Sequence, residues 1–125
     1  MNILWQDQPD RAIVWNRYMR ANYAVWQPGQ ECDVHSHRDA VELFVFLDGQ
    51  CEMTVGDETA IVGAGQTVYV GPDVKHKLRA IGDQPLVMFL AVTPNHSPTH
   101  TIFRPDGSII EHDRQPPGPG QIGYE

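Results

Sequence analysis

Residues 29–49 read GQECDVHSHRDAVELFVFLDG, and they place two histidines and a glutamate within one short stretch. His35 and His37 are two residues apart, so on an extended strand both imidazoles point to the same face. Glu42 begins an alternating apolar run in which Phe44 and Phe46 share its face. The spacing therefore predicts two strands whose inner faces carry a pair of imidazoles and a carboxylate.

A second stretch, residues 75–80, alternates cations with His, Leu and Ala in the order KHKLRA. On a half-buried strand this pattern turns His76 inward with Leu78 and Ala80, while the three cations face water. A buried imidazole needs a polar partner. We therefore expect His76 to join the two histidines and the glutamate of the first stretch.

Chain length, charge and cysteine usage limit the class of protein. The 125 residues are typical of one domain, and the net charge of -7 disfavours binding to nucleic acid because it repels phosphate. Cys32 and Cys51 fit no CxxC pattern and no dense disulfide framework, which favours reduced thiols in the cytoplasm. A secreted protein with one disulfide is the alternative.

Membrane attachment is not expected. Residues 1–11 lack the basic start and apolar run of a signal peptide. The longest apolar run, 86–92, is far shorter than the roughly 20 residues that span a bilayer. The sequence thus predicts a soluble protein with no membrane or nucleic-acid partner.

The spacing of Gly and Pro predicts an all-β fold, because both recur every several residues between short apolar segments. Turn signals at Gly49 and Gly56 separate such segments. The expected strands are 12–16, 22–27, 34–36, 43–47, 51–55, 59–62, 67–70, 76–80 and 86–93, with one more possible at 101–103. Many short strands indicate a sandwich or a barrel. We expect one domain over 1–114, including N-terminal strands, and a flexible Pro/Gly-rich tail over 115–125.

The order and spacing of the ligand-type residues resemble the cupin family. The first cupin motif runs Gly, five residues, His-x-His, three or four residues, Glu, six residues, Gly. The matching positions here are Gly29, His35, His37, Glu42 and Gly49, with every interval kept. The resemblance implies a jelly-roll β-barrel, a double-stranded β-helix, with a metal ion near its middle.

The second cupin motif is matched only in part. It runs Gly, five residues, Pro-x-Gly, two residues, His, three residues, Asn. Gly65 and His76 match, but Gly71 stands at the proline, Asp73 at the glycine and Ala80 at the asparagine. These departures fall on turn and supporting positions, so they affect the loop before the histidine more than the predicted ligand itself.

The predicted ligand set is His35, His37, Glu42 and His76. Three imidazoles and one carboxylate suit one divalent transition metal ion, which can be Fe, Mn, Ni, Co or Zn. A six-coordinate ion would keep two positions for water or substrate, as reactive metal sites do. The competing interpretation, that these are core histidines with a glutamate as hydrogen-bond partner, needs four independent coincidences of spacing.

Parity suggests which side chains line the cavity beside the metal. Phe44 and Phe46 follow Glu42 on its face, and Met53 faces inward if its neighbours on that strand face water. Tyr23 and Met88 are further pocket candidates on strands that are apolar on both faces. For each of them, a place in the ordinary barrel core is the alternative.

The other histidines are assigned to the surface. His96 and His100 are four apart in a stretch with two prolines, so a helical ligand pair is not expected and a solvated turn is. His112 lies between two acidic residues and is interpreted as a surface residue.

Two functions remain for the predicted site. The first is a metal-dependent enzyme on a small organic substrate, foremost a dioxygenase, then a decarboxylase, lyase or isomerase, with Glu42 as candidate catalytic base. The second is a non-catalytic or sensory module that binds a small molecule through the metal. Resemblance to small cupins also implies a homodimer.

Overall fold

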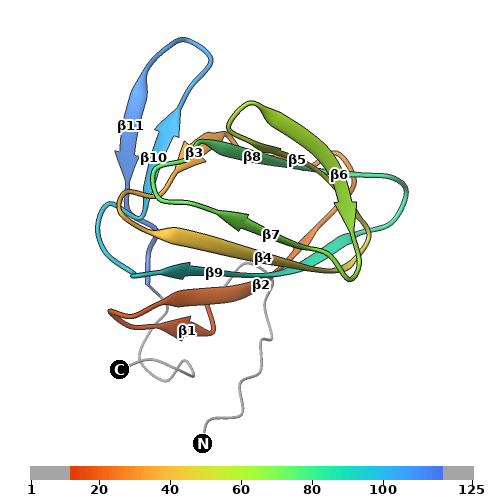
Figure 1. Cartoon of the computed structure of the whole chain (residues 1–125), viewed down its shortest axis with the longest axis horizontal. Coiled ribbons are helices and arrows are strands. Elements are labelled where there is room, and N and C mark those ends of the chain that lie inside the picture. The colour runs from red at the N-terminus through yellow and green to blue at the C-terminus, as the bar shows by residue number, and fades with distance from the viewer. Residues whose placement is uncertain (1–11, 117–125) are drawn as a thin grey trace, which may run out of the picture.

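The computed structural model of the chain describes residues 12–116 as two antiparallel β-sheets that face each other (Figure 1). The described residues contain no helix. The strands are β1 (Val14–Trp15), β2 (Arg20–Trp26), β3 (Val34–Ser36), β4 (Val41–Asp48), β5 (Gln50–Val55), β6 (Glu58–Gly63), β7 (Thr67–Val70), β8 (His76–Ile81), β9 (Leu86–Thr93), β10 (His100–Phe103) and β11 (Ile109–His112). The predicted all-β jelly-roll class is thus confirmed.

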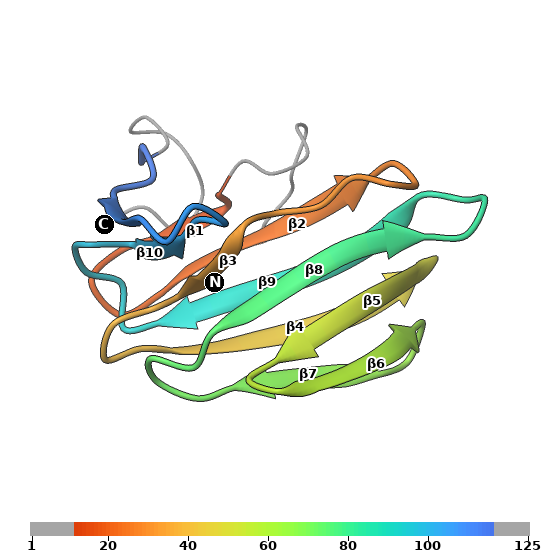
Figure 2. The ribbon, with the colours of Figure 1, turned by 90° about the horizontal axis from the view of Figure 1, so that it is seen from above.

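The strand order of the two sheets explains how distant motifs come together. The five-stranded sheet has the order β1-β2-β9-β4-β7, and the six-stranded sheet has the order β11-β10-β3-β8-β5-β6. Figure 2 shows them one above the other, with long strands running in similar directions. Strands adjacent in sequence often lie in different sheets, so motifs far apart in the chain meet inside the barrel.

The inner face of the five-stranded sheet changes from polar to apolar along its strands. Strand register aligns inward side chains of β2, β9 and β4 in rows. In order, the rows are Arg20, Val92 and Glu42; then Asn22, Leu90 and Phe44; then Ala24, Met88 and Phe46; and last Trp26 with Leu86. On these three strands, charged inward side chains are therefore confined to one end.

The apolar end forms the core. Phe46 and Leu86 of the five-stranded sheet are fully buried, and Cys51, Met53 and Leu78 pack against them from the facing sheet. Burying one such large side chain stabilises the fold by roughly 1.5–3 kcal/mol. The alternation predicted for KHKLRA is confirmed, because His76, Leu78 and Ala80 are all buried.

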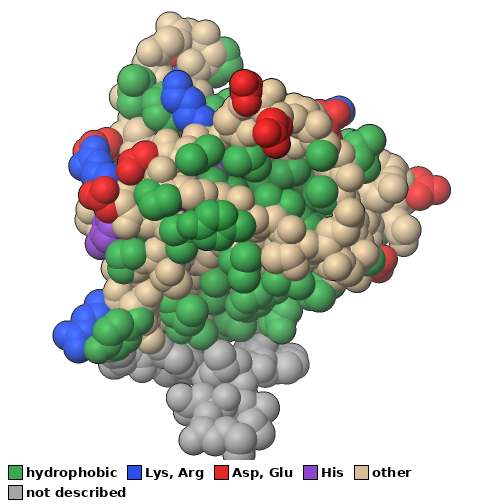
Figure 3. Space-filling view, viewed as in Figure 1, with side chains coloured by type: hydrophobic (Ala, Val, Ile, Leu, Met, Phe, Trp, Pro, Cys, Tyr) green, Lys and Arg blue, Asp and Glu red, His purple; other side chains and the backbone are tan. Residues whose placement is uncertain are grey.

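The outer face of the five-stranded sheet is apolar and exposed. Tyr23, Leu43 and Tyr69 are 39%, 40% and 61% exposed, and cross-strand pairing places Leu43 beside Tyr69. Figure 3, in the orientation of Figure 1, shows hydrophobic side chains across the middle of this view and charged side chains toward its edges. Because apolar surface tends to be covered, this face is available for a protein contact.

A glycine turn between β4 and β5 depends on the absence of a side chain. Gly49 has φ +74°, and a Cβ there would lie 2.3 Å from the Pro85 carbonyl oxygen. Asp73, which stands at a glycine of the cupin motif, likewise keeps a left-handed backbone with φ 62°. Its N–H donates to the His37 carbonyl at 3.1 Å, so the loop before His76 is tied to the first motif despite the substitution.

The C-terminal region differs from the sequence prediction. The possible strand at 101–103 is present as β10, but β11 (Ile109–His112) is not predicted, because its residues are mixed in character and show no clean alternation. β11 pairs with β10, and β10 pairs with β3. The predicted flexible tail lies outside the described residues beyond 116.

Candidate metal centre

The four predicted ligands converge from both sheets. His35 lies on β3 and faces His76 of β8 in register, His37 follows β3 directly, and Glu42 lies on β4 of the opposite sheet. One nitrogen or oxygen atom from each of the four lies within 4.8 Å of the others. We call these four residues the metal cluster.

Short nitrogen–oxygen contacts within the metal cluster centre on the carboxylate. Glu42 Oε1 lies 2.9 Å from Nε2 of His37 and 2.9 Å from Nε2 of His76. All three of these residues are at most 4% exposed. His35 completes the group with its ring centroid 4.2 Å from that of His76.

Backbone carbonyls fix the orientation of every imidazole in the metal cluster. Nδ1 of His35, His37 and His76 lies 2.8, 2.7 and 2.9 Å from a carbonyl oxygen, respectively of Asp33, Thr99 and Val74. A carbonyl oxygen can only accept, so Nδ1 carries the proton. In the neutral rings Nε2 is then the lone-pair nitrogen, which is the arrangement found in metal-ligating histidines.

This donor set fits a divalent transition metal ion. Because the protons are on Nδ1, the Nε2 lone pairs of His37 and His76 both point at Glu42 Oε1. Lone pairs repel a carboxylate oxygen, so this arrangement needs a cation or added protons between them. Three nitrogens and one oxygen are ligands that Fe, Mn, Ni, Co and Zn all accept. The metal cluster would hold the ion through three Nε2 atoms and the carboxylate.

The electrostatics keep the ligands in the charge states that a metal needs. Burial raises the pKa of Glu42, but in the metal-free protein added protons on Nε2 of His37 and His76 would donate hydrogen bonds to the carboxylate, which outweigh burial and hold the pKa well below its usual range. Burial, together with the nearby His76, lowers the pKa of His35 to about 4. Glu42 is therefore anionic and His35 neutral near pH 7.

A cavity of about 230 Å³ opens beside the metal cluster, with His35 and Glu42 in its wall. Its apolar lining consists of Ala24, Trp26, Phe44, Leu78, Met88, Leu90 and Ile102. Among the predicted pocket residues, Phe44 and Met88 thus line the cavity. Phe46 and Met53 are buried in the core but do not line it, because they lie farther toward the apolar end.

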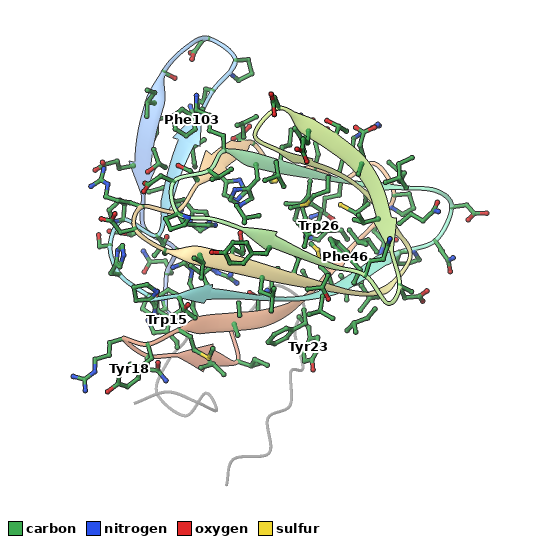
Figure 4. The ribbon with its side chains drawn as sticks, in the orientation of Figure 1. Trp15, Tyr18, Tyr23, Trp26, Phe46 and Phe103 are labelled. Atoms are coloured by element: carbon green, nitrogen blue, oxygen red, sulfur yellow. The ribbon has the colours of Figure 1, made fainter. Side chains whose placement is uncertain are left out.

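Tyr23 is not a pocket residue, and that prediction is wrong. Its neighbours Asn22 and Ala24 both line the cavity, so the alternation of β2 turns Tyr23 outward. Its ring lies against Phe89 on the outer face with centroids 5.4 Å apart. In Figure 4, Tyr23 lies outside the five-stranded sheet, whereas Trp26 lies between the two sheets.

His100 is a second correction. The sequence predicts a solvated turn, but His100 opens β10 and lines the cavity. Pairing of β10 with β3 brings its ring centroid within 5.0 Å of that of His37 and 5.5 Å of that of His35. Burial and the neighbouring histidines lower its pKa to about 2, so the ring is neutral. His112 is exposed, as predicted.

A buried arginine binds the carbonyl oxygen that orients one imidazole of the metal cluster. Arg20 is 4% exposed, and its Nη2 donates to the Thr99 carbonyl at 2.7 Å, the same oxygen that accepts from His37. Its Nη1 donates to Asn95 Oδ1 at 3.1 Å. Burial lowers its pKa to about 10, so it is still a cation near pH 7. A lone arginine in an apolar strand gave no sequence signal for this role.

Three further polar residues that the sequence analysis does not predict, Asn22, Asp33 and Arg114, line the cavity. Arg114 donates from Nη1 to Asn22 Oδ1 at 3.2 Å, across 92 residues of chain. We call Asn22, His100 and Arg114 the mouth residues. None belongs to a motif, and only their inward position in the fold identifies them.

Both cysteines are free thiols. Burial raises the pKa of Cys51 to about 11 and raises that of Cys32 as well. Both are therefore protonated near neutral pH, which makes them poor nucleophiles.

Comparison with known proteins gives a family match. A family model described as Cupin domain matches residues 22–93. An uncharacterized protein of Methanocaldococcus jannaschii, MJ1618, is 31% identical over 74 residues, which are 59% of this chain and 59% of that protein. The polyketide synthase CurC of Streptomyces cyaneus is 27% identical over 71 residues, covering 57% of this chain and 46% of that protein. The chain thus spans only about half the length of these relatives.

Solved structures share the fold. A Klebsiella pneumoniae protein with a double-stranded β-helix domain has a TM-score of 0.66 at 20% identity, covering 74% of this chain and 83% of that one. The DMSP lyase DddQ of Ruegeria pomeroyi has a TM-score of 0.67 at 18% identity, covering 78% and 52%. An oxalate oxidase in complex with glycolate has a TM-score of 0.57 at 19% identity, covering 62% and 43%.

Among residues 12–116 there is no helix of the length and hydropathy that crossing a membrane requires.

Proposed function

This chain belongs to the cupin domain family, and we propose that it is a mononuclear metal-dependent enzyme acting on a small organic substrate, foremost as a dioxygenase-type oxidoreductase. One observation carries the proposal. Four ligand atoms converge within 4.8 Å of one another, and two of the four residues, His35 and Glu42, line a cavity large enough for a small molecule. Structural metal sites are closed, whereas sites that face a cavity can admit substrate.

The residues of the metal cluster have separate roles in this proposal. The three imidazoles, fixed by their Nδ1 hydrogen bonds, would hold the ion and keep its position relative to the cavity. A bound ion would supply substrate orientation, activation of dioxygen if it is redox-active, or a lowered pKa of bound water. Glu42, anionic and in the cavity wall, is the candidate base for a substrate proton.

Structural neighbours support catalysis on this fold. Oxalate oxidase and DMSP lyase are enzymes by their names, and their structures share this architecture. Decarboxylase, lyase and isomerase activities are accordingly the other reaction classes to assay. The fold alone does not choose among them.

The experiment is a metal and turnover assay on the purified protein. Metal content is measured by elemental analysis, and the protein reconstituted anaerobically with Fe(II) is tested for oxygen uptake with catechols, flavonols, diketones and thiols. Oxygen uptake that His76→Gln abolishes would support the dioxygenase. Tight metal retention without turnover of any compound would favour the alternative, a module that binds a small molecule through the ion.

We also propose a cytoplasmic homodimer that buries the outer face of the five-stranded sheet. The support is the exposed apolar surface at Tyr23, Leu43 and Tyr69 (Figure 3). Light scattering after gel filtration should give twice the chain mass for the wild-type protein and the single mass for Tyr69→Lys. A wild-type monomer would contradict this part of the proposal.

A further inference from the structure

Two histidines outside the metal cluster, His100 and His112, lie opposite each other on neighbouring strands. They form a register pair between β10 and β11, and their ring centroids are 6.2 Å apart. Residues that face each other across antiparallel strands have their side chains on the same face of the sheet. Because His100 lines the cavity, His112 is on the cavity side of β11 as well.

This pair of histidines continues into the metal cluster. Thr101 of β10 pairs with Ser36 of β3, so the next residues, His100 and His37, lie beside each other at the end of β3. Their ring centroids are 5.0 Å apart. We call His37, His100 and His112 the histidine row. It runs across the neighbouring strands β3, β10 and β11, from the metal cluster to the edge of the six-stranded sheet (Figure 1).

The adjacent row of side chains on the same sheet is different. Strand register aligns, from β8 to β11, the residues His76, His35, Ile102 and Ile110. In that row the imidazoles are replaced by isoleucines after β3, so metal-binding atoms do not reach the edge strand. Of these two rows, only the histidine row carries imidazoles as far as β11.

Exposure to solvent rises along the histidine row. His37 is 4% exposed, His100 is half-buried in the cavity wall, and His112 is exposed. A divalent ion loses its hydration at a high free-energy cost unless other ligands replace the water molecules. Imidazole nitrogens are good replacements for transition metal ions. Closely spaced imidazoles can therefore replace the waters stepwise between solvent and the buried metal cluster.

The orientation of His100 matches that of the imidazoles in the metal cluster. Its Nδ1 lies 2.8 Å from Thr99 Oγ1, and that hydroxyl oxygen lies 3.2 Å from the His112 carbonyl oxygen. A carbonyl oxygen only accepts, so the hydroxyl donates its proton there and Oγ1 accepts from the Nδ1–H of His100. Nε2 of His100 then carries the lone pair, as it does in the three predicted histidine ligands.

Two arginines lie near the histidine row, and their contacts do not occupy its Nε2 atoms. Arg20 contacts His37 at Nδ1, with Nη2 at 3.2 Å, whereas Nε2 of His37 faces Glu42. Arg114 donates to Asn22 on the five-stranded sheet, opposite the sheet that carries the row. The net charge of -7 on the whole chain favours the approach of a cation.

We infer that the histidine row is the route by which a divalent metal ion enters and leaves the metal cluster. His112 binds the ion from solvent, and His100 transfers it to His37. The inference rests on the metal centre of the proposed function, but on no reaction there. An ion held at His100 has an effective concentration in the millimolar range relative to the metal cluster, far above the micromolar zinc of a loading experiment.

The test is the rate of zinc loading, measured by rapid mixing of the metal-free protein with zinc and a fluorescent zinc indicator. His112→Gln and His100→Gln should each slow loading by about tenfold, because the stepwise transfer is lost. The equilibrium zinc affinity of His112→Gln should equal that of the wild-type protein. Release of zinc to excess chelator should then slow by the same factor, since an unchanged affinity requires both rates to change together.

Further variants separate a route from a general effect on the fold. A protein with both His100→Gln and His112→Gln should load no more slowly than the slower single variant, because residues that serve one path are not additive. His96→Gln is the matched control and removes a histidine outside the row. Asp33→Asn tests entry past the acidic residue in the cavity wall. Both should load at the wild-type rate, and circular dichroism should be the same in all variants.

Wild-type loading rates in His112→Gln and His100→Gln would overturn the inference, even if the protein retains zinc and turns over a substrate. Slower loading in Asp33→Asn alone would overturn it as well and would favour entry through the cavity. So would a lower zinc affinity in His112→Gln at an unchanged loading rate, because His112 would then be a ligand. A wild-type protein that retains no zinc would contradict the metal centre itself, and with it both proposals.

Discussion

The metal cluster and the mouth residues meet at one cavity, but the sequence encodes them differently. The metal cluster comes from two motifs in which spacing along the chain fixes which side chains share a face. Asn22, His100 and Arg114 come from three distant segments that meet only through strand pairing and one hydrogen bond across 92 residues. Short sequence patterns therefore specify the metal ligands, whereas the pairing of distant strands specifies the other polar residues of the cavity.

The largest expected effect is on zinc affinity, and it distinguishes the metal ligands from other histidines. His76→Gln removes one of the three imidazoles of the metal cluster, and zinc affinity should fall by more than about 100-fold, since loss of an outer-shell partner already costs about 10- to 100-fold. Competition with a chelator measures it. His96→Gln is the control outside the cluster and should change nothing. Equal zinc affinity in both variants would remove the distinction between the two regions.

A second substitution tests which motif residues serve the fold. Gly49→Ala should lower the free energy of unfolding by about 3 kcal/mol, because it combines a positive φ with a steric clash. The contact is 2.3 Å to the Pro85 carbonyl oxygen. Gly29→Ala, at the other end of the same motif, has φ +90° but no atom within 4 Å of the new Cβ. It should cost only about 1 kcal/mol.

Urea denaturation measures both values. A cost for Gly29→Ala as large as that for Gly49→Ala would mean that steric room does not separate the two glycines. In either variant that stays folded, zinc affinity should remain that of the wild-type protein, because neither glycine carries a ligand.

His100 gives the sharpest comparison between the metal cluster and the mouth residues, because it is a mouth residue that lies beside the metal cluster. Its ring lies 5.0 Å from that of His37, yet it is not part of the group whose ligand atoms converge. His100→Phe should therefore lower zinc affinity by less than about tenfold, the lower bound for an outer-shell partner. A loss comparable to that in His76→Gln would make His100 a fifth ligand and merge the two regions.

The smallest effect concerns pH and the metal-free protein. Burial lowers the pKa of His35 from 6.5 to about 4, so the folded state binds fewer protons than the unfolded state in this window. The free energy of unfolding should thus fall as the pH drops from 6.5 to about 4. Urea denaturation across this range measures it, and His35→Asn should flatten the slope. Stability that rises on acidification would contradict the buried, neutral state of His35.

Sequence patterns predicted the strands around the metal cluster because each has a clear period or a turn at its end. They failed at Tyr23, because β2 is apolar on both faces, and the alternation of its side chains therefore does not show which face points inward. They failed at His100 and Arg114 for a different reason. Whether a side chain after residue 94 faces the cavity depends on β10 pairing with β3 and on β11 pairing with β10. No short-range signal encodes those pairings.

Crystallography of the protein soaked with zinc, with anomalous scattering at the zinc edge, tests the central claim most directly. The account predicts one strong peak per chain, about 2.0–2.2 Å from Nε2 of the three histidines and from a Glu42 oxygen. The peak should disappear in His76→Gln. A map without density among these side chains, or with zinc only at His96 or His112 outside the metal cluster, would contradict it.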